Sequence, residues 1–204
     1  MKRCSAFSLI ELIVVMAIIA IVAAIVVPVA GNVSRGVKLS HATQTVGDEL
    51  AAARQSAIGR NRAIELRIYQ YSDPEIPGSA SCFRALQMFE IINAYSFSAL
   101  DKVQALPTAT IIDSGATLSS LLDPSKVTIS NGVDALPRVG TNYKYVAFRF
   151  RPDGSTNLSP TAGSWFLTVH EENKGDALAQ PPPNFNTLEV DPVNGSVRLF
   201  RPGV

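Results

Sequence analysis

The sequence predicts an α+β protein in which one long N-terminal helix packs on an antiparallel β-sheet. Three observations lead to this fold class. An almost uninterrupted apolar run covers residues 7–30, apolar residues then recur at steps of three and four to about residue 59, and beyond residue 61 the period changes to two. The longer period is typical of one face of a helix and the shorter one of a strand. One helix followed by a series of strands joined by turns predicts an α+β fold with an antiparallel sheet.

The apolar run is long enough for a membrane-spanning helix. Leu12–Ala30 contains 19 residues without a charged side chain. As a helix this segment would be roughly 28 Å long, about the thickness of the hydrocarbon core of a bilayer. A cleaved secretory signal has a shorter apolar region followed by a small-x-small site, and no good site of this kind with a polar flank follows the apolar run here. An uncleaved signal anchor explains the length and the basic start, but it leaves Glu11 unexplained, because a carboxylate at membrane depth is costly.

Beyond Pro28 the helical pattern continues and becomes amphipathic. The apolar positions predicted to share one face are Val29, Val33, Val37, Val46, Leu50, Ala53 and Ala57. Pro28 has no backbone N–H group, so we expect a bend in the helix near Ala24. The helix should end near residues 59–61, where glycine and asparagine are stop signals.

The remaining residues predict short strands. These strands cover residues 63–71, 83–93, 110–112, 127–129, 145–151, 165–170, 187–191 and 196–200. Asp153-Gly154 and Asn194-Gly195 are hairpin signals between strand pairs. Residues 72–82 and 171–186 are predicted as loops, and residues 118–122 as a short helical turn. The alternating pattern that predicts strands is weakest between residues 94 and 142.

Composition narrows the function classes. Eighteen basic and 17 acidic side chains give a net charge of +1, and without the first six residues 16 basic side chains face 17 acidic ones. This balance gives no overall attraction to nucleic acid or to an anionic membrane. Cys4 and Cys82 lie on opposite sides of the apolar run. If that run spans a membrane, they cannot pair, so we expect no disulfide framework, and Cys82 is predicted to be a plain thiol.

No residue pattern predicts an enzyme, a metal site or a cofactor. The sequence contains no Gly-x-Ser-x-Gly, P-loop or Cys-x-x-Cys motif. His170 precedes two glutamates, but no second histidine or cysteine stands at ligand spacing, so a solvated strand end is predicted. The scattered carboxylates Asp101, Asp113, Asp123 and Asp134 lack the rhythm of a calcium loop. No small-molecule substrate is implied.

A cluster of aromatic and basic residues allows a second function to be considered. Tyr143, Tyr145 and Phe148 with Arg149 and Arg151 could form a stacking platform for nucleic acid. Strand alternation divides these side chains between the two faces of the sheet, however. Burial of the rings is therefore the favoured interpretation.

The N-terminus resembles the type IV prepilin family. A basic leader, MKRCSA, is followed by Phe-Ser-Leu-Ile-Glu and then by the apolar run. The resemblance implies that a prepilin peptidase cuts between Ala6 and Phe7 and methylates the new N-terminus at Phe7. Glu11 then becomes the fifth residue of the mature chain, and Pro28 takes the position at which many pilins carry a helix-kinking proline. Alanine replaces the glycine that usually precedes the cut.

The resemblance also implies a domain plan and a set of partners. Residues 1–6 would be the leader, 7–30 the transmembrane and assembly helix, 31–60 the amphipathic half of the helix, and 61–204 the globular β-rich domain. The partners implied are the peptidase, other pilins and the inner membrane, with the C-terminal domain in the periplasm. Glu11 would pair with the N-terminal amine of a neighbouring subunit, because two costly charges then become one pair.

Three later stretches of the sequence resemble one subgroup of the prepilin family. LAAARQSAIGRNRAIELRI at residues 50–68, FRFRPDGS at 148–155 and DPVNGSVRLFRPG near the end resemble the minor H-type pseudopilins of the GspH/FimT type. They also resemble the pilin-like "cassette protein D" group of the Verrucomicrobium/Chthoniobacter cassettes. DNA-binding relatives in the FimT branch carry Gly-Arg-x-Arg in the closing hairpin. Ser196 replaces the first of these arginines.

Three hypotheses therefore follow from the sequence. The leading one is a minor pilin or pseudopilin of a type IV pilus or a type II secretion-like filament, without enzymatic activity. The second is a binding module at a filament tip that captures DNA or a secreted substrate. The third is a membrane-anchored enzyme or other protein of uncharacterised role. Neighbouring genes for a secretion ATPase and a prepilin peptidase would separate the first hypothesis from the others.

Overall fold

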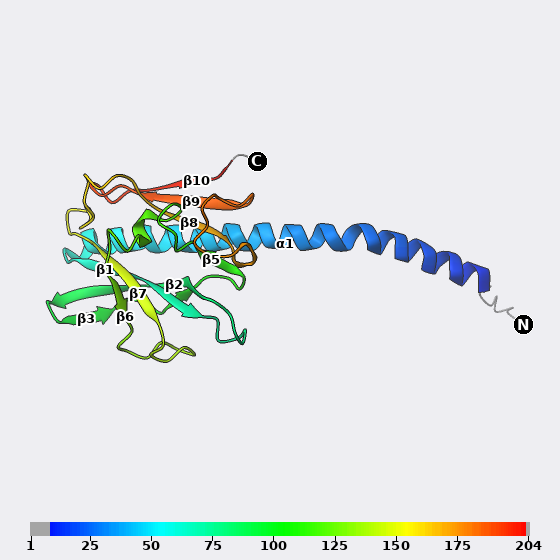
Figure 1. The fold of residues 1–204 in the computed structure, drawn as a ribbon, viewed down its shortest axis with the longest axis horizontal. Helices are drawn as coiled ribbons and strands as arrows, with labels where there is room; N and C mark the ends of the chain where they lie inside the picture. Colours follow the sequence, from blue (N-terminus) through cyan, green and yellow to red (C-terminus); the bar gives the residue numbers. More distant parts are fainter. Residues whose placement is uncertain (1–8, 203–204) are drawn as a thin grey trace, which may run out of the picture. The chain divides into compact units, whose positions relative to one another are not determined.

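The computed structural model describes the backbone of residues 9–202 and the side chains of residues 9–23 and 34–202. The chain forms two compact units, residues 1–37 and residues 38–204. The helix α1 (Leu9–Arg60) supplies the described part of the first unit and the opening segment of the second. The second unit holds the whole sheet (Figure 1). A helix packed on an antiparallel sheet confirms the predicted α+β class.

The second half of α1 is held to the sheet by one apolar stripe. Its fully buried members recur at steps of three and four: Leu39, Ala42, Val46, Leu50, Ala53 and Ala57. The prediction for the last four is confirmed, but Val37 is 63% exposed and was wrongly assigned to this face. At about 100° per residue, nine residues place Val37 half a turn away from Val46.

The end of α1 is formed by an asparagine. Asn61 has a φ of +52°, a left-handed conformation that asparagine tolerates better than most residues. The next amide, from Arg62, donates to the carbonyl of Ala57 at 3.2 Å. The helix thus stops where predicted, after Arg60.

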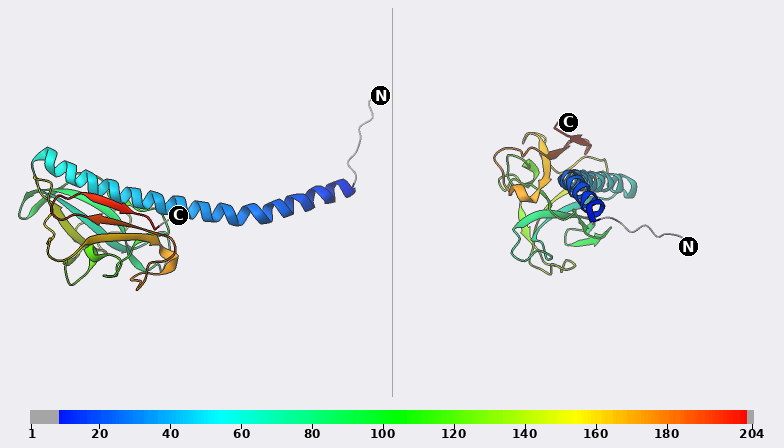
Figure 2. Two further views of the ribbon diagram at one scale, coloured as in Figure 1. Left: turned by 90° about the horizontal axis from the view of Figure 1, so that it is seen from above. Right: turned by 90° about the vertical axis from the view of Figure 1, so that its right-hand side faces the viewer.

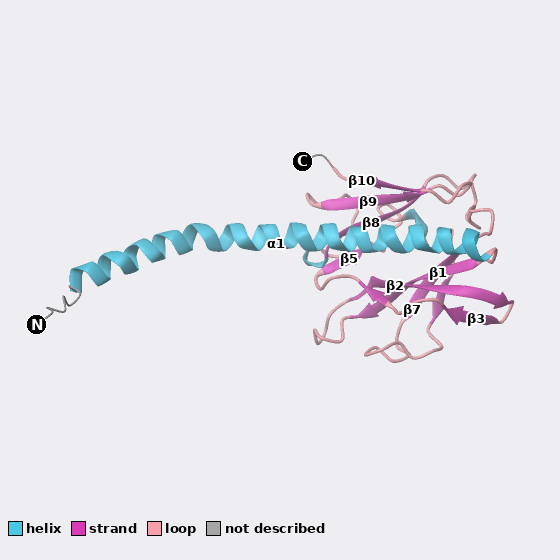
Figure 3. Cartoon of the chain, turned by 180° about the vertical axis from the view of Figure 1, so that it is seen from behind, coloured by secondary structure: helices cyan, strands magenta, loops and turns pink. Residues whose placement is uncertain are grey.

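Ten strands form one antiparallel sheet in the described part of the chain (Figure 3). They are β1 (Ile64–Ser72), β2 (Ser81–Asn93), β3 (Ser96–Ala99), β4 (Gln104–Ala105), β5 (Thr110–Ile112), β6 (Ile129–Asn131), β7 (Lys144–Phe150), β8 (Trp165–Glu171), β9 (Phe185–Val190) and β10 (Val197–Phe200). The order is β10-β9-β8-β5-β2-β1-β7-β6, and β3 and β4 also pair with β2. Two 3₁₀ turns, η1 (Ser120–Leu122) and η2 (Glu172–Lys174), interrupt the connections.

Most strand predictions are confirmed, and the differences have local causes. The turn at Gly154 forms, but β7 and β8 do not pair as the hairpin signal suggested, because β7 lies between β1 and β6. The sequence missed β3 and β4, which are short and rest on the edge of β2. The strand expected at 127–129 lies at β6, and the expected loop at 171–186 contains η2.

The sheet curves around the second half of α1, so that its distant parts meet. Strands β8 to β10 lie on one side of this helix and β1, β2 and β7 on the other (Figures 1 and 2). The turn after β7 contacts the β9–β10 turn: Thr156 donates through its amide to the carbonyl of Pro192 at 3.0 Å. Arg54 of α1 donates to the carbonyl of Asn194 at 2.8 Å. We call these joined turns, residues 151–156 and 191–196, the turn clasp.

The two faces of the sheet build two apolar clusters. The face toward α1 carries the main core, which includes Leu66, Ile68 and Phe148. The opposite face carries a smaller cluster around Tyr69 and Tyr143. Both faces are therefore covered, and the second one holds the polar features described next.

Candidate functional site

The residues predicted for processing and assembly are only partly described. Ala6 and Phe7 lie outside the described residues, so cleavage and methylation stay predictions. Pro28 falls within the range of α1, and the bend expected there also stays a prediction. Glu11 lies in the first turn of α1, where the helix dipole favours a negative charge, and its side chain is exposed.

The helix around Glu11 presents apolar side chains on every side. Their exposed fractions run from 48% to 78%, in Leu9, Ile10, Leu12, Ile13, Val14, Val15, Met16, Ile18, Ile19, Ile21 and Val22. We call this set the N-terminal apolar surface. A helix that is apolar all round is normally buried among other apolar groups. Among the residues that the structure describes, no helix combines the length and the hydropathy needed to cross a bilayer.

A groove of about 780 Å³ lies on the sheet face opposite α1. Residues 73–75, 99–110 and 134–139 supply its walls. Its floor comes from β1 and β2, through Arg67, Tyr69, Tyr71, Arg84, Gln87 and Phe89. A volume of this size is in the range of small-ligand sites. We call it the outer groove.

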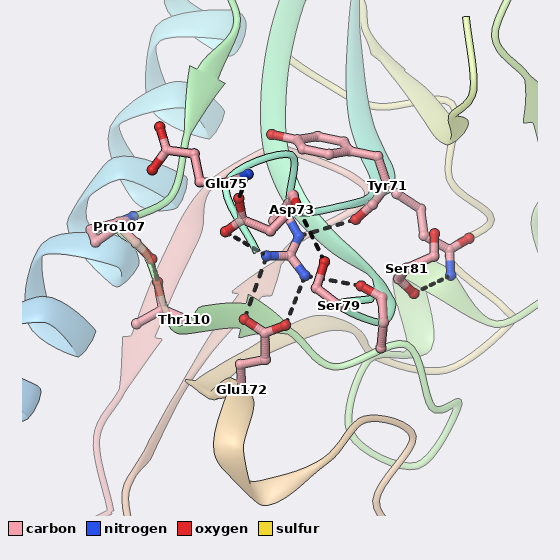
Figure 4. Close-up of polar contacts among 11 residues, drawn as sticks. Tyr71, Asp73, Glu75, Ser79, Ser81, Pro107, Thr110 and Glu172 are labelled. Carbon is pink, nitrogen blue, oxygen red and sulfur yellow. Dashed lines mark hydrogen bonds and ion pairs between the residues drawn. The ribbon is translucent and has the colours of Figure 1, made fainter. Parts of the chain in front are cut away.

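Arg84 lines the outer groove and is the centre of a buried ion cluster; it is 5% exposed. Its guanidinium donates to Glu172 at 2.9 Å, to Asp73 at 3.4 Å and to the carbonyl of Tyr71 at 3.1 Å (Figure 4). Burial opposes the charged form, but the hydrogen bond and charge of Glu172, with Asp73, raise the pKa of Arg84. The cluster ties β2 to the loop after β1 and to η2.

The middle of the floor is built around Arg67. Its Nε donates to Glu65 at 2.8 Å, and its guanidinium carbon lies 4.1–4.9 Å from the ring centres of Phe89, Phe97 and Tyr145. Stacking of a guanidinium on aromatic faces is favourable in addition to the ion pair. Arg67 is therefore part of the structure of the floor and is not free to bind an anion.

The predicted division of the aromatic residues in β7 is confirmed. Phe148 lies in the main core, and Tyr143 packs edge-on against Tyr69 with ring centres 5.3 Å apart. Tyr145 stacks on Arg67. Arg149 pairs with Glu65 at 3.1 Å. These side chains do not form one continuous stacking surface.

The chemistry available in the outer groove is mainly apolar. The three arginines that line it are paired, Arg67 and Arg84 as described and Arg138 with Glu75 at 3.0 Å. Leucine, proline and tyrosine side chains supply much of the wall. Within residues 9–202, no group of three or more histidine, cysteine, aspartate or glutamate side chains could hold a metal ion. The groove thus suits an apolar or aromatic group better than a polyanion.

The prediction for His170 was wrong. Instead of a solvated strand end, the structure has a fully buried imidazole whose Nε2 lies 3.0 Å from Oδ2 of Asp113. The segment after η2 covers this end of β8, which the strand pattern alone could not indicate. Cys82 is a buried free thiol, as predicted, and burial raises its pKa.

Sequence reasoning missed the buried ionic residues. Arg84 gave a signal, because it is one charge inside the apolar run CFRALQMF, and such a charge needs a buried partner. Its partner Glu172 lies 88 residues further along the chain, so the pair was not readable. The same distance problem hid Asp113 and His170.

A long N-terminal helix with a carboxylate in its first turn thus runs into an antiparallel sheet. Residues 1–27 match the family described as the prokaryotic N-terminal methylation motif. The match confirms the prepilin-type methylation motif predicted from the leader. No curated protein sequence matches the chain.

Two solved proteins are similar in structure. One is the minor pseudopilin EpsH from the Type 2 Secretion System of Vibrio cholerae, with 13% identity and a TM-score of 0.46, covering 82% of this chain and 99% of that chain. The other is the type IV minor pilin FimU of Pseudomonas aeruginosa, with 13% identity and a TM-score of 0.44, covering 79% of this chain and 87% of that chain.

Proposed function

We propose that this chain is a minor pilin or pseudopilin, a structural subunit of a type IV pilus or a type II secretion-like filament. The observation that carries the proposal is the methylation motif at residues 1–27, which includes the start of α1. In this role the chain has no catalytic function of its own. The N-terminal apolar surface is the part that packs against other subunits.

Glu11 has a specific part in this assembly. A cut before Phe7 frees an α-amine four residues from Glu11, with a reference pKa of about 7.7–8.0. When subunits pack helix on helix, Glu11 of one meets the amine of the next. Neither charge is then left alone among apolar side chains, and the pair marks the correct register between subunits.

The same role sets the location of the chain. We place residues 7–30 in the inner membrane before assembly and the domain after residue 30 in the periplasm. Lys2 and Arg3 precede the apolar run, as the positive-inside rule requires. A reporter fused after Val204 should be active only in the periplasm, and cytoplasmic activity would contradict this topology.

Processing can be tested directly. Co-expression with a prepilin peptidase should lower the intact mass by the first six residues and add one methyl group. Cleavage after Ala30 would instead support an ordinary secretory protein and contradict the proposal.

Substitution of Glu11 tests the assembly role. Glu11→Gln should reduce crosslinking to partner pilins in membranes by at least about tenfold, because the neighbour's amine loses its charge partner. Membrane abundance should stay normal, since losing a charge eases insertion. Asp48→Asn, an exposed carboxylate on the second half of α1, is the matched control and should crosslink normally. Normal crosslinking of Glu11→Gln would mean that Glu11 has no part in assembly. Loss of abundance together with crosslinking would assign it to insertion.

A further inference from the structure

The His170 ring faces an acceptor at each nitrogen. Nδ1 lies 2.9 Å from the carbonyl oxygen of Glu171, and Nε2 lies 3.0 Å from Oδ2 of Asp113. A neutral imidazole has one N–H group and can satisfy only one of these contacts. The protonated ring satisfies both. Because His170 and Asp113 are both fully buried, water does not supply the missing donor.

The contacts of Asp113 decide which partner carries the charge. The amide of Gly115 donates to Oδ1 at 2.8 Å, and the amide of Leu178 donates to Oδ2 at 3.2 Å. Hydrogen bonds from backbone amides favour the ionised carboxylate. The pair is therefore an imidazolium with a carboxylate. Burial opposes the charge on each partner, but their hydrogen bond raises the pKa of His170 and lowers that of Asp113.

Asp113 also fixes a segment that the sequence leaves as loop. Besides the Leu178 contact, Asp176 accepts the amide of Ser114 at 2.7 Å. A Cβ on Gly115 would lie 3.0 Å from the backbone of Ala177, so residues 175–178 pack closely on the turn after β5. This segment directly follows η2, whose Glu172 pairs with Arg84, a residue that lines the outer groove.

We propose that the ring proton of His170 operates a latch: it holds residues 172–178 against β5 and β8, and its loss releases this segment and opens the Arg84 end of the outer groove. A neutral ring that keeps its Nε2–H on Asp113 turns the Nδ1 lone pair toward the carbonyl oxygen of Glu171, the residue directly before η2. The repulsion between the lone pair and this oxygen pushes the start of residues 172–178 away from β8. This gate goes beyond the filament role proposed above and does not depend on it.

The charges around the His170 ring decide whether the latch is closed at low or at high pH. Asp113 at the end of β5 and Asp176 in the covering segment both face His170 and favour its cation. A histidine whose pKa is raised in the folded state contributes stability below its unfolded value of about 6.5. That contribution is lost as the pH rises through the folded value. The latch is closed in acid and opens in alkali.

Cys82 provides a reporter for the opening. Its thiol is 1% exposed, and it lies near Asp176, Arg84 and Glu172. In the full-length chain with Cys4→Ser, kept in detergent micelles, we would measure its labelling by a thiol reagent from pH 5.5 to 9. Rates are divided by those of the urea-unfolded chain, which removes the effect of thiol ionisation. The corrected rate should rise roughly ten- to a hundredfold across the His170 titration, as loss of a charge-assisted hydrogen bond implies.

Two variants complete the test. His170→Gln should label fast at every pH with no step, whereas His41→Gln, the other histidine, should match the parent chain, because His41 is exposed on α1. A flat corrected rate in the parent chain, or the same step in His170→Gln, would refute the latch. If His170→Gln does not fold, ¹⁵N NMR of the unmodified ring decides. Both nitrogens should be protonated at pH 6.5, and a neutral ring at that pH would overturn the proposal.

Discussion

Replacement of Glu49 by glutamine should stabilise the protein in alkaline solution. Glu49 lies on α1 and Asp101 lies after β3. Among the described residues, neither Oε2 of Glu49 nor Oδ2 of Asp101 has a hydrogen-bond donor. Asp101 accepts the amide of Met88 at 2.9 Å through Oδ1. A proton on Glu49 supplies the one hydrogen bond that these two carboxyl groups can make with each other.

The size of the effect follows from the pKa of Glu49. Burial, then the charge and hydrogen bond of Asp101, and then Asp48 raise it from 4.5 to about 7. A pKa shift of one unit corresponds to about 1.4 kcal/mol of stability, so the stability lost when Glu49 ionises is at most about 3 kcal/mol. Because the side chain is partly exposed, we expect a loss of about 2 kcal/mol. A raised carboxyl pKa gives stability that is fully present below about pH 4.5 and is lost as the pH rises through 7.

Glutamine stays neutral at every pH, and its amide can donate to Asp101. Glu49→Gln should therefore unfold at a temperature roughly 4–8 °C higher than the parent chain at pH 9, and at a similar temperature at pH 5. Fluorescence of Trp165, the single buried tryptophan, follows unfolding of the full-length chain in micelles. Asp134→Asn is the control and should change little, because Asp134 is exposed and is not among the groups that raise the pKa of Glu49. Equal melting of parent and Glu49→Gln at pH 9 would refute the reasoning.

Two further substitutions test the turn clasp and the Arg84 cluster by the same unfolding assay. Gly195→Ala should cost about 2–3 kcal/mol, because φ is +65° and the new Cβ would collide with a backbone carbonyl; Gly163→Ala, with φ +89° but open space, should cost about 1 kcal/mol. Arg84→Met should cost about 3–5 kcal/mol, since Glu172 is left without its cation, whereas Arg138→Met in an exposed pair should cost under about 1 kcal/mol. A larger loss of stability in Gly163→Ala than in Gly195→Ala, or in Arg138→Met than in Arg84→Met, would contradict these assignments.

The fold was readable because its signals are local. The period of three to four residues in α1 and the period of two in β7 and β9 reflect one buried face each, which adjacent residues reveal. The helix stop at Asn61 is likewise a property of one residue. The pairing between strands that are distant in the sequence could not be predicted from it. The turn at Gly154 looks like a hairpin locally, yet β7 belongs between β1 and β6, and only long-range packing decides this.

The candidate sites also fall into those formed by neighbouring residues, which the sequence predicts, and those formed by distant residues, which it does not. The motif around Glu11 is contiguous and was recognisable, and residues 1–27 match the methylation family. The ionic groups come from segments far apart: Asp113 and His170 are separated by 57 residues. Alternation assigns a residue to a face, but it does not show which charge lies opposite. His170 was therefore expected in solvent, although the fold brings Asp113 to it.

The turn clasp gives a physical reason for two motifs that the sequence presents separately. FRFRPDGS ends in one of the two turns that touch and DPVNGSVRLF begins with the other, and a Cβ at Gly195 would meet the carbonyl of Gly154 and the ring of Phe150. Glycine is thus required at position 195 by packing and by its positive φ. Arg198 stands directly across from Glu189 on β9, so the arginine of the closing hairpin has an opposite charge beside it within the sheet. The Gly-Ser-Val-Arg run is accounted for by closure of the curved sheet over α1, and its residues need no nucleic-acid ligand to explain them.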